Sequence, residues 1–186
     1  MRKIKIETPF GKEAAYSLRC GENVLLSGVI YTARDAAHAR LHEAVISGET
    51  LPFPVENAIV YYVGPTPAMP GFVIGSAGPT TGGRMDAYTP ALISLGLTGM
   101  IGKGSRSPEV TCAMKKNGAV YFGAIGGAGA LLARCVRASE VTAYEDLGAE
   151  AIRKLTVRDM PLTVIIDSEG NDLYIQGREE YLKHRG

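Results

Sequence analysis

A glycine-rich segment, residues 78–86, has the residue types of an anion-binding corner. It reads GPTTGGRMD, so Thr80 and Thr81 offer hydroxyls and Arg84 offers a planar guanidinium that matches a carboxylate. Glycines let the backbone approach a ligand closely, and a helix expected to begin near Asp86 would direct its free N–H groups toward the same anion. The alternative is a simple connector in which a threonine caps the helix and Arg84 is solvated.

A second glycine-rich corner places two cations just before an expected helix. Lys103 and Arg106 precede Ser107, which begins a Ser-Pro-Glu sequence typical of a helix N-terminus. With the free N–H groups these cations could hold an anion, and otherwise they are solvated charges on a capped turn. The segment is not a nucleotide-binding Walker A loop, because that motif requires a glycine at Leu97 and a serine or threonine at Gly104.

A third set of polar residues, in the sequence TARDAAH, follows an apolar stretch. Arg34 lies in the first turn of an expected helix and can face the same edge as the two corners. Asp35 and His38 share a helix face and could pair, which would set the tautomer of the imidazole. His38 and His42 have the spacing of a zinc-binding helix, but Ala39 replaces the glutamate of HExxH. A structural or supporting role is therefore favoured for His38.

The cysteines limit the metal chemistry expected of this chain. Cys20, Cys112 and Cys135 are far apart and form no CxxC pair, which argues against a disulfide framework and against a self-contained iron–sulfur cluster. A further glycine-rich turn, residues 123–130, lacks GxGxxG spacing, and we interpret it as tight packing between a strand and a helix. The sequence predicts no metal ligands here.

The overall composition is that of an ordinary globular protein. The 186 residues are 46% hydrophobic and 21% charged, with a net charge of +1, so nothing global favours nucleic acid or an anionic membrane. No apolar run approaches the length of a membrane span, and the N-terminal sequence lacks the hydrophobic core of a signal peptide. We expect a cytoplasmic protein that binds anions through locally placed cations.

Strand and helix patterns alternate along the chain and predict an α/β fold with a mixed sheet. We expect a single domain, residues 1–186, with its glycine-rich corners on one edge of the sheet, where open α/β sheets bind ligands. The predicted strands are residues 4–6, 15–18, 24–30, 58–63, 72–76, 98–101, 120–124 and 151–157, followed by a hairpin of 162–167 and 172–175. The predicted helices are residues 34–46, 86–95, 108–116 and 128–135, with a short one at the C-terminus.

Six segments, in the same order, resemble the C-terminal domain or separate β subunit of class I fumarases and L-tartrate dehydratases. They are TARDAAH, GPTTGGRMDAY, GKGSRS, FGAIGGAGALLA, YEDLGAEAI and MPLTVIIDSEGNDLY, and they cover the chain from about residue 5 to about residue 180. The resemblance implies a swivelling β/β/α domain. It also implies a hydro-lyase subunit that is active only with a second chain.

The resemblance further implies which residues do the chemistry. In that family an α subunit or N-terminal domain holds a [4Fe–4S] cluster through cysteines and leaves one iron open, so the cofactor belongs to a cluster-bearing partner. Thr80 would be the base, and Arg34, Arg84 and Lys103 would contact a small dicarboxylate. The residues expected to support them are Thr81, Asp35, His38 and Arg106. 

The implied reaction is the reversible hydration of fumarate to L-malate, in a complex expected to be α2β2. L-tartrate dehydration and hydration of a methylated fumarate use the same motifs and stay open, as do a non-catalytic carboxylate-binding module and a structural subunit. The chain departs from many relatives at Gly82, where alanine is common, and at Ser105, where asparagine is common. The spacing from Thr80 to Lys103 is one residue shorter than in some relatives.

Overall fold

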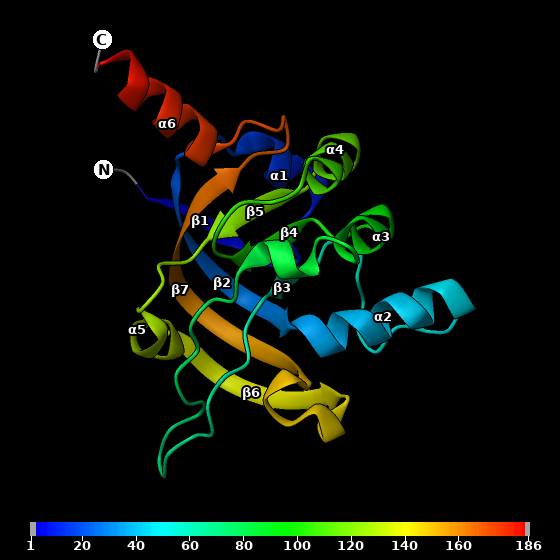
Figure 1. Cartoon of the computed structure of the whole chain (residues 1–186). Coiled ribbons are helices and arrows are strands. Elements are labelled where there is room, and N and C mark those ends of the chain that lie inside the picture. The colour runs from blue at the N-terminus through cyan, green and yellow to red at the C-terminus, as the bar shows by residue number, and fades with distance from the viewer. Residues whose placement is uncertain (1–2, 185–186) are drawn as a thin grey trace.

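The computed structural model describes residues 3–184 and consists of a sheet with helices packed on it (Figure 1). The strands are β1 (Ile4–Glu7), β2 (Asn23–Thr32), β3 (Ile59–Tyr61), β4 (Gly99–Gly102), β5 (Val120–Gly123), β6 (Val136–Ala143) and β7 (Ile152–Ile166). The α-helices are α1 (Lys12–Ser17), α2 (Asp35–Ser47), α3 (Thr89–Ser94), α4 (Pro108–Asn117), α5 (Gly129–Ala133) and α6 (Leu173–Lys183). Two 3₁₀ helices, η1 (Gly82–Met85) and η2 (Glu145–Glu150), complete the elements of these residues.

The sheet is mixed and closes on itself. Its strand order is β1-β2-β3-β4-β5-β7-β6, with an additional pairing between β2 and β7. Strands β1 to β5 are parallel to their neighbours, whereas β7 is antiparallel to β2, β5 and β6. Because β7 pairs with both β2 and β5, it closes a ring of five strands. The predicted α/β class with a mixed sheet is confirmed.

Alternate residues of the parallel strands face two different hydrophobic clusters. In β3, Ile59 and Tyr61 pack in a cluster shared with β2, β5 and β7, while Val60 and Tyr62, the latter just after β3, pack beneath the helices. Both faces of β3 are buried, as is typical of a parallel strand covered on each side. Figure 1 shows α2, α3 and α4 stacked along one side of the sheet, which gives the β/β/α layering that the resemblance implies.

The helix boundaries follow local sequence signals. Helix α2 ends at Gly48, which adopts the left-handed conformation that glycine favours at this position. Helix α4 begins after Ser107, whose side chain accepts a hydrogen bond from the Val110 N–H, and Pro108 is its first residue. These ends match the predictions for residues 34–46 and 108–116 to within about a residue, well inside the usual disagreement between assignments.

Three predicted strands were wrong, two others form one continuous strand, and one strand was missed. Residues 15–18 belong to α1 and its end, since a short apolar run does not distinguish a strand from a helix. Residues 72–76 form no strand, because Phe72 and Val73 are exposed in a loop without a neighbouring strand to pair with. The predicted hairpin turns as expected, with an isolated bridge between Ile166 and Asp172, but Asp172 then caps α6 instead of starting a strand. The predicted strand at residues 151–157 continues through 166, and β6 was missed.

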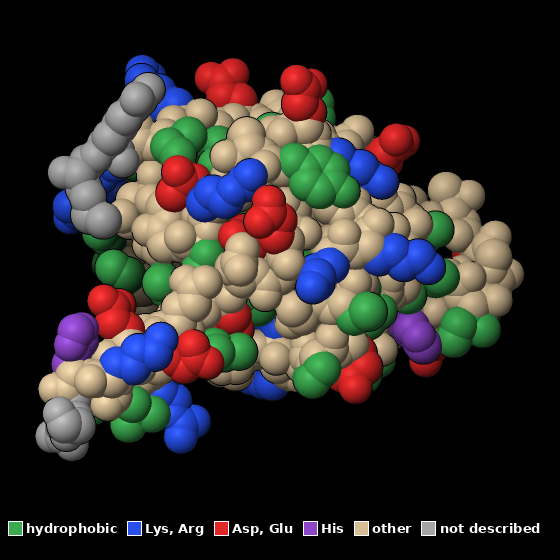
Figure 2. Space-filling model, turned by 90° about the horizontal axis from the view of Figure 1, so that it is seen from above, with side chains coloured by type: hydrophobic (Ala, Val, Ile, Leu, Met, Phe, Trp, Pro, Cys, Tyr) green, Lys and Arg blue, Asp and Glu red, His purple; other side chains and the backbone are tan. Residues whose placement is uncertain are grey.

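Charges of both signs are spread over the face that carries α1, α4 and α6. Figure 2 shows basic and acidic side chains interspersed there, with neither sign gathered into a continuous patch. Within residues 3–184, no helix is both long enough and apolar enough to cross a membrane.

Candidate functional site

The predicted residues come together at the carboxyl ends of the parallel strands. Arg34 follows β2 and Lys103 follows β4, with β3 between these two strands. The segment that carries Thr80 lies between the ends of β3 and β4: the Thr80 N–H donates to the Tyr62 carbonyl at 2.7 Å, and the Thr80 carbonyl accepts from the Lys103 N–H at 3.2 Å. The glycine-rich corner thus reaches the expected edge, although no strand precedes it.

Asp35 joins two of the predicted cations. Its Oδ1 accepts from Nε of Arg84 at 2.7 Å, and its Oδ2 lies 3.3 Å from Nε of Arg34. Partial burial alone would raise the pKa of Asp35, but backbone hydrogen bonding and the guanidiniums of Arg84 and Arg34 hold it below the ordinary value. Asp35 is therefore an ionised bridge between the start of α2 and η1. This geometry fits its predicted supporting role.

The side chains of Thr80 and Lys103 have no partners among the described residues. Thr80 is half-buried and its hydroxyl makes no hydrogen bond within residues 3–184. Lys103 is exposed, and no ion pair reaches its ammonium within the same residues. Thr81 is bridged to Lys103 through the backbone, so the two corners are held in fixed register. A hydroxyl and an ammonium are thus open to a ligand at the same edge.

Arg106 points inward, unlike Lys103 three residues before it. Its side chain is fully buried, with Nε 2.7 Å from Oδ1 of Asp86 and Nη2 2.9 Å from the Thr89 hydroxyl. The guanidinium also lies over the rings of Tyr62 and Tyr121, at 5.2 and 4.9 Å from their centroids. The idea that Arg106 helps to hold an anion at the start of α4 does not match this geometry. Its contacts support η1 from beneath.

A glycine at position 82 leaves room for this buried layer. A Cβ there would lie 2.6 Å from the Tyr121 hydroxyl and 2.9 Å from Cδ of Arg106. The Tyr121 hydroxyl is itself buried and has no hydrogen-bond partner among the described residues. Tyr121 therefore takes the space of a methyl group at Gly82, which gives a physical reason for glycine at this position.

His38 is part of the same buried layer. Its Nδ1 lies 3.2 Å from the Arg34 carbonyl, so the pair considered between Asp35 and His38 is not formed. Burial lowers the pKa of His38 to about 4, and Arg106 adds to the shift while the Arg34 carbonyl and Asp35 oppose it. The ring packs edge-on against Tyr62. His38 is neutral at physiological pH, in keeping with a structural role.

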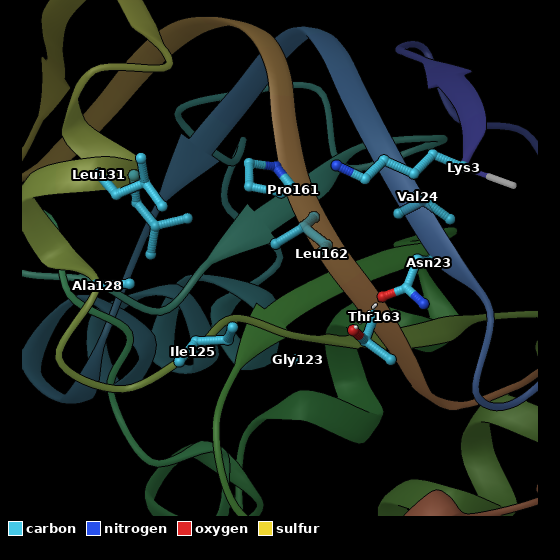
Figure 3. Close-up of a pocket in the computed structure, with 11 residues that line it drawn as sticks. Lys3, Asn23, Val24, Gly123, Ile125, Ala128, Leu131, Pro161, Leu162 and Thr163 are labelled. Carbon is cyan, nitrogen blue, oxygen red and sulfur yellow. Dashed lines mark hydrogen bonds between the residues drawn. The ribbon is translucent and has the colours of Figure 1, made fainter. Parts of the chain in front are cut away.

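The glycine turn after β5 packs against the first corner. A Cβ at Gly129 would overlap the Ser76 hydroxyl and lie 3.0 Å from the Gly78 nitrogen, so the interpretation as tight packing holds. On its other side lies a small cavity of about 90 Å³, lined by eleven residues that include Ile125, Leu131 and Pro161 (Figure 3). No predicted site residue lines this cavity. The candidate site is instead the exposed edge that carries Thr80, Arg84 and Lys103.

One carboxylate at the site was not predicted. Oε1 of Glu150, at the end of η2, lies 3.0 Å from Nη2 of Arg34. The only sequence signal was its place in the segment YEDLGAEAI, which gives no indication of a contact with α2. Pairing between η2 and α2 spans more than a hundred residues, and such contacts cannot be read from local patterns.

The described residues do not fit a metal cluster. Cys20, Cys112 and Cys135 are unpaired and lie before β2, in α4 and after α5. Within residues 3–184 no three His, Cys, Asp or Glu side chains gather in a group able to hold a metal ion. An iron–sulfur cluster would have to be held by other residues.

The model of the protein family described as Fumarase C-terminus matches residues 1–177. The chain belongs to this fumarase C-terminal family. It is 39% identical over 176 residues to fumarate hydratase 2 of Leishmania major, covering 92% of this chain and 31% of that protein. It is 44% identical over 153 residues to the aerobic class I fumarate hydratase of Escherichia coli K12, covering 81% of this chain and 28% of that protein.

A third relative of the fumarase C-terminal family has a different length. The chain is 38% identical over 169 residues to the putative L(+)-tartrate dehydratase subunit beta of Methanocaldococcus jannaschii, covering 88% of this chain and 87% of that protein. The chain thus spans about a third of the length of the two fumarate hydratases but nearly all of the beta subunit. The resemblance seen in the six sequence segments is confirmed.

Proposed function

We propose that this chain is the β subunit of a [4Fe–4S]-dependent hydro-lyase that hydrates fumarate to L-malate, with the cluster held by an α subunit. The observation that carries the proposal is the convergence of Arg34, Arg84, Lys103 and Thr80 at one sheet edge in a member of the fumarase C-terminal family. Two guanidiniums and an ammonium complement the two carboxylates of the substrate. 

The cations act on the charge that develops during the reaction. In the direction from L-malate to fumarate, removing a proton next to a carboxylate spreads additional negative charge onto that carboxylate, and cations already in place stabilise it. The same cations stabilise the same charge in the hydration direction, before the carbon is protonated. Arg84 is fixed by Asp35 at 2.7 Å and Arg34 by Asp35 and Glu150, so neither has to be ordered when the substrate binds. 

Thr80 is proposed as the base that takes the proton. A hydroxyl is a poor base at its ordinary pKa, so this role requires a neighbouring cation to stabilise the alkoxide. The alternative is that Thr80 only donates a hydrogen bond to the substrate. Loss of kcat with KM preserved in Thr80→Ala, and recovery in Thr80→Ser, would support the base role, whereas a rise in KM alone would assign Thr80 to substrate binding.

An open site supports the need for a partner. Arg84 is 51% exposed, and Thr81 and Lys103 are exposed as well, so this chain does not exclude water from the edge. The partner is proposed to supply the cluster, the general acid and the opposite wall of the site. The cluster would supply a Lewis acid for the hydroxyl of L-malate in the dehydration direction, or for the water that is added to fumarate in the hydration direction. 

L-tartrate dehydration is the second candidate. It is favoured by one observation, the 38% identity to the putative L(+)-tartrate dehydratase subunit beta, which extends over 87% of that protein. Identity is higher to the fumarate hydratase of E. coli, 44% against 38%, and for this reason we place fumarate first. The two substrates are both small dicarboxylates and use the same cations.

The proposal is tested by purifying the chain from its native source without oxygen and assaying the material with fumarate and with L-tartrate. We expect an iron-containing partner and hydration of fumarate. Dehydration of L-tartrate instead would move the assignment to the second candidate. A chain that purifies alone, binds dicarboxylates and gains no activity from any partner would be a binding module, and the proposal would be wrong.

A further inference from the structure

Glu150 holds both the side chain of Arg34 and the helix that follows it. Its Oε1 lies 3.0 Å from Nη2 of Arg34, and its Oε2 accepts the N–H of Ala36 at 2.9 Å. The Ala36 N–H is one of the groups in the first turn of α2 that have no partner inside the helix. A single carboxylate therefore fixes the direction of the guanidinium and the start of the element that carries it.

The end of η2 is itself anchored to the sheet. The buried hydroxyl of Thr32, the last residue of β2, donates to the Ala151 carbonyl at 3.2 Å and accepts from the Arg153 N–H at 2.9 Å. Glu150 precedes Ala151, so its backbone is held against the strand that leads into Arg34. The pair is also shielded, since the Arg34 and Glu150 side chains are 26% and 24% exposed, and shielding strengthens an ion pair relative to one in full solvent.

Two further contacts enclose the Arg34 guanidinium. Nε is 3.3 Å from the Asp35 carboxylate, and a Cβ at Gly64 would lie 2.8 Å from Nη1 and 3.1 Å from Cδ. Asp35, Glu150 and Gly64 thus border the side chain on three sides. Within residues 3–184 no acceptor pairs with Nη1, so its N–H groups remain available to donate to a ligand beside Gly64.

We propose that Glu150 is a positioning residue of the dicarboxylate site: it orients Arg34 so that one edge of the guanidinium faces the substrate. The inference rests on the proposed function. Arg34 is held by two carboxylates, Arg84 by one and Lys103 by none among the described residues. Arg34 is therefore the most ordered cation of the site, and an ordered donor loses little entropy on binding.

Glu150→Gln in the assembled enzyme tests this role. Both oxygens of Glu150 accept hydrogen bonds, but glutamine has one acceptor, and its amide N–H would face a donor on Arg34 or on Ala36. We expect kcat/KM for the dicarboxylate to fall about 10- to 100-fold, mainly through KM, as misplaced site groups commonly do. The matched control is Asp146→Asn, since Asp146 also ties η2 to α2, through Arg40, without touching a site residue. That control should stay within about twofold of wild type.

A double-mutant cycle separates positioning from general support of the fold. If Glu150 acts through Arg34, Glu150→Gln causes no further loss once Arg34→Ala has been introduced. Gly64→Ala is a second variant, because its methyl group would lie 2.8 Å from Nη1 of Arg34 and displace that side chain while keeping the Glu150 carboxylate, with a lesser contact of 3.2 Å to the Ala149 carbonyl. We expect it to raise KM as well, which keeps the test valid should Glu150→Gln fail to assemble.

The outcomes distinguish this inference from the proposed function. If Arg34→Ala lowers kcat/KM but Glu150→Gln and Gly64→Ala do not, the positioning role is wrong and the dicarboxylate site stands. If the losses from Arg34→Ala and Glu150→Gln multiply, Glu150 supports the fold alone, and the inference is also wrong. If Arg34→Ala itself has no effect, Arg34 is not part of the site and both statements fail.

Discussion

Two cations from the same glycine-rich corner lie in opposite environments. Lys103 is exposed and unpaired within the described residues, whereas Arg106 is fully buried and bound to Asp86 and Thr89. Beneath the exposed edge lies a layer of polar groups, with Arg106 packed between the rings of Tyr62 and Tyr121. The edge presents charged groups to solvent, whereas the layer beneath it satisfies its charged groups within the protein.

The difference shows that a charged residue close to a candidate site can either support the fold or be free to bind a ligand, and residue type alone does not show which. A buried guanidinium must have its partners within the protein, because an unpaired buried charge is very costly. A guanidinium or ammonium at the surface keeps part of its hydration and can exchange water for a carboxylate. Variants of the buried layer should therefore change stability, and variants of the edge should change catalysis.

The largest effect is expected for Arg106→Met. It removes the partner of Asp86 and leaves the Thr89 hydroxyl with fewer contacts, so the free energy of unfolding should fall by about 3–5 kcal/mol, as is usual when one member of a buried ion pair is lost. Urea unfolding of the purified chain measures it. Arg84→Met, which removes an exposed guanidinium, is the matched control and should cost less than about 1 kcal/mol. Equal losses in the two variants would remove the distinction between layer and edge.

The buried layer should also be sensitive to acid through His38. Burial is the main cause that lowers its pKa from 6.5 to about 4, so the fold favours the neutral ring. The stability that His38 contributes is therefore complete above pH 6.5 and is lost as the pH falls from 6.5 to about 4, where the unfolded chain takes up the proton first. The loss should reach roughly 3 kcal/mol at pH 4. Unfolding in urea between pH 4 and 7 should show this slope for wild type and not for His38→Phe; the same slope in both would place its origin elsewhere.

At the edge, Arg84→Ala should affect catalysis more than stability. Losing a charge-assisted contact in the transition state costs about 2–3 kcal/mol, which corresponds to a fall in kcat/KM of about 30- to 150-fold. Steady-state kinetics of the assembled enzyme with fumarate measure this ratio. An unchanged kcat/KM would remove Arg84 from the site.

Gly82 lies where the exposed edge packs on the buried layer, so a substitution there tests the contact between them. Gly82→Ala adds a methyl group 2.6 Å from the Tyr121 hydroxyl, and overpacking of this kind costs about 1–3 kcal/mol. Gly82→Ala combined with Tyr121→Phe removes the hydroxyl but leaves Cδ of Arg106 2.9 Å from the added methyl group, so it should recover part of the loss. Thermal unfolding of the single and double variants checks the result; failure of Tyr121→Phe to recover any stability would show that the contact with Arg106 or the backbone of η1, and not the tyrosine hydroxyl, requires glycine.

The parts of the candidate site that depend only on which residues follow each strand could be predicted from the sequence. Arg34 and Lys103 directly follow parallel strands, and the carboxyl ends of such strands meet at one edge. Whether Arg106 points in or out could not be predicted, because a loop has no periodicity that assigns a face. The contact of Glu150 with Arg34 joins η2 to α2 across a long stretch of chain, and no local pattern reports it.

The errors in the predicted secondary structure have similar causes. Strand β7 includes Pro161 and Asp159, the latter with a φ of 50°, so its middle resembles a turn and one strand was predicted as two pieces. Strand β6 is an edge strand in which half of the residues are polar and half are exposed, and it resembles a loop. The segment at residues 72–76 has strand-like composition but no neighbouring strand to pair with, and pairing decides whether such a segment becomes a strand.

We propose that the three cations at the sheet edge, Arg34, Arg84 and Lys103, bind the dicarboxylate of a hydro-lyase. The most direct test replaces Arg34, Arg84 and Lys103 together by glutamine and measures kcat/KM for fumarate in the complex with the cluster-bearing partner. A control with the same change in charge replaces Lys12, Lys116 and Arg178, which lie on α1, α4 and α6. We expect at least about a thousandfold loss in the first variant, with assembly and iron content unchanged, and nearly full activity in the control. Full activity in the first variant would contradict the claim and leave this chain a structural subunit.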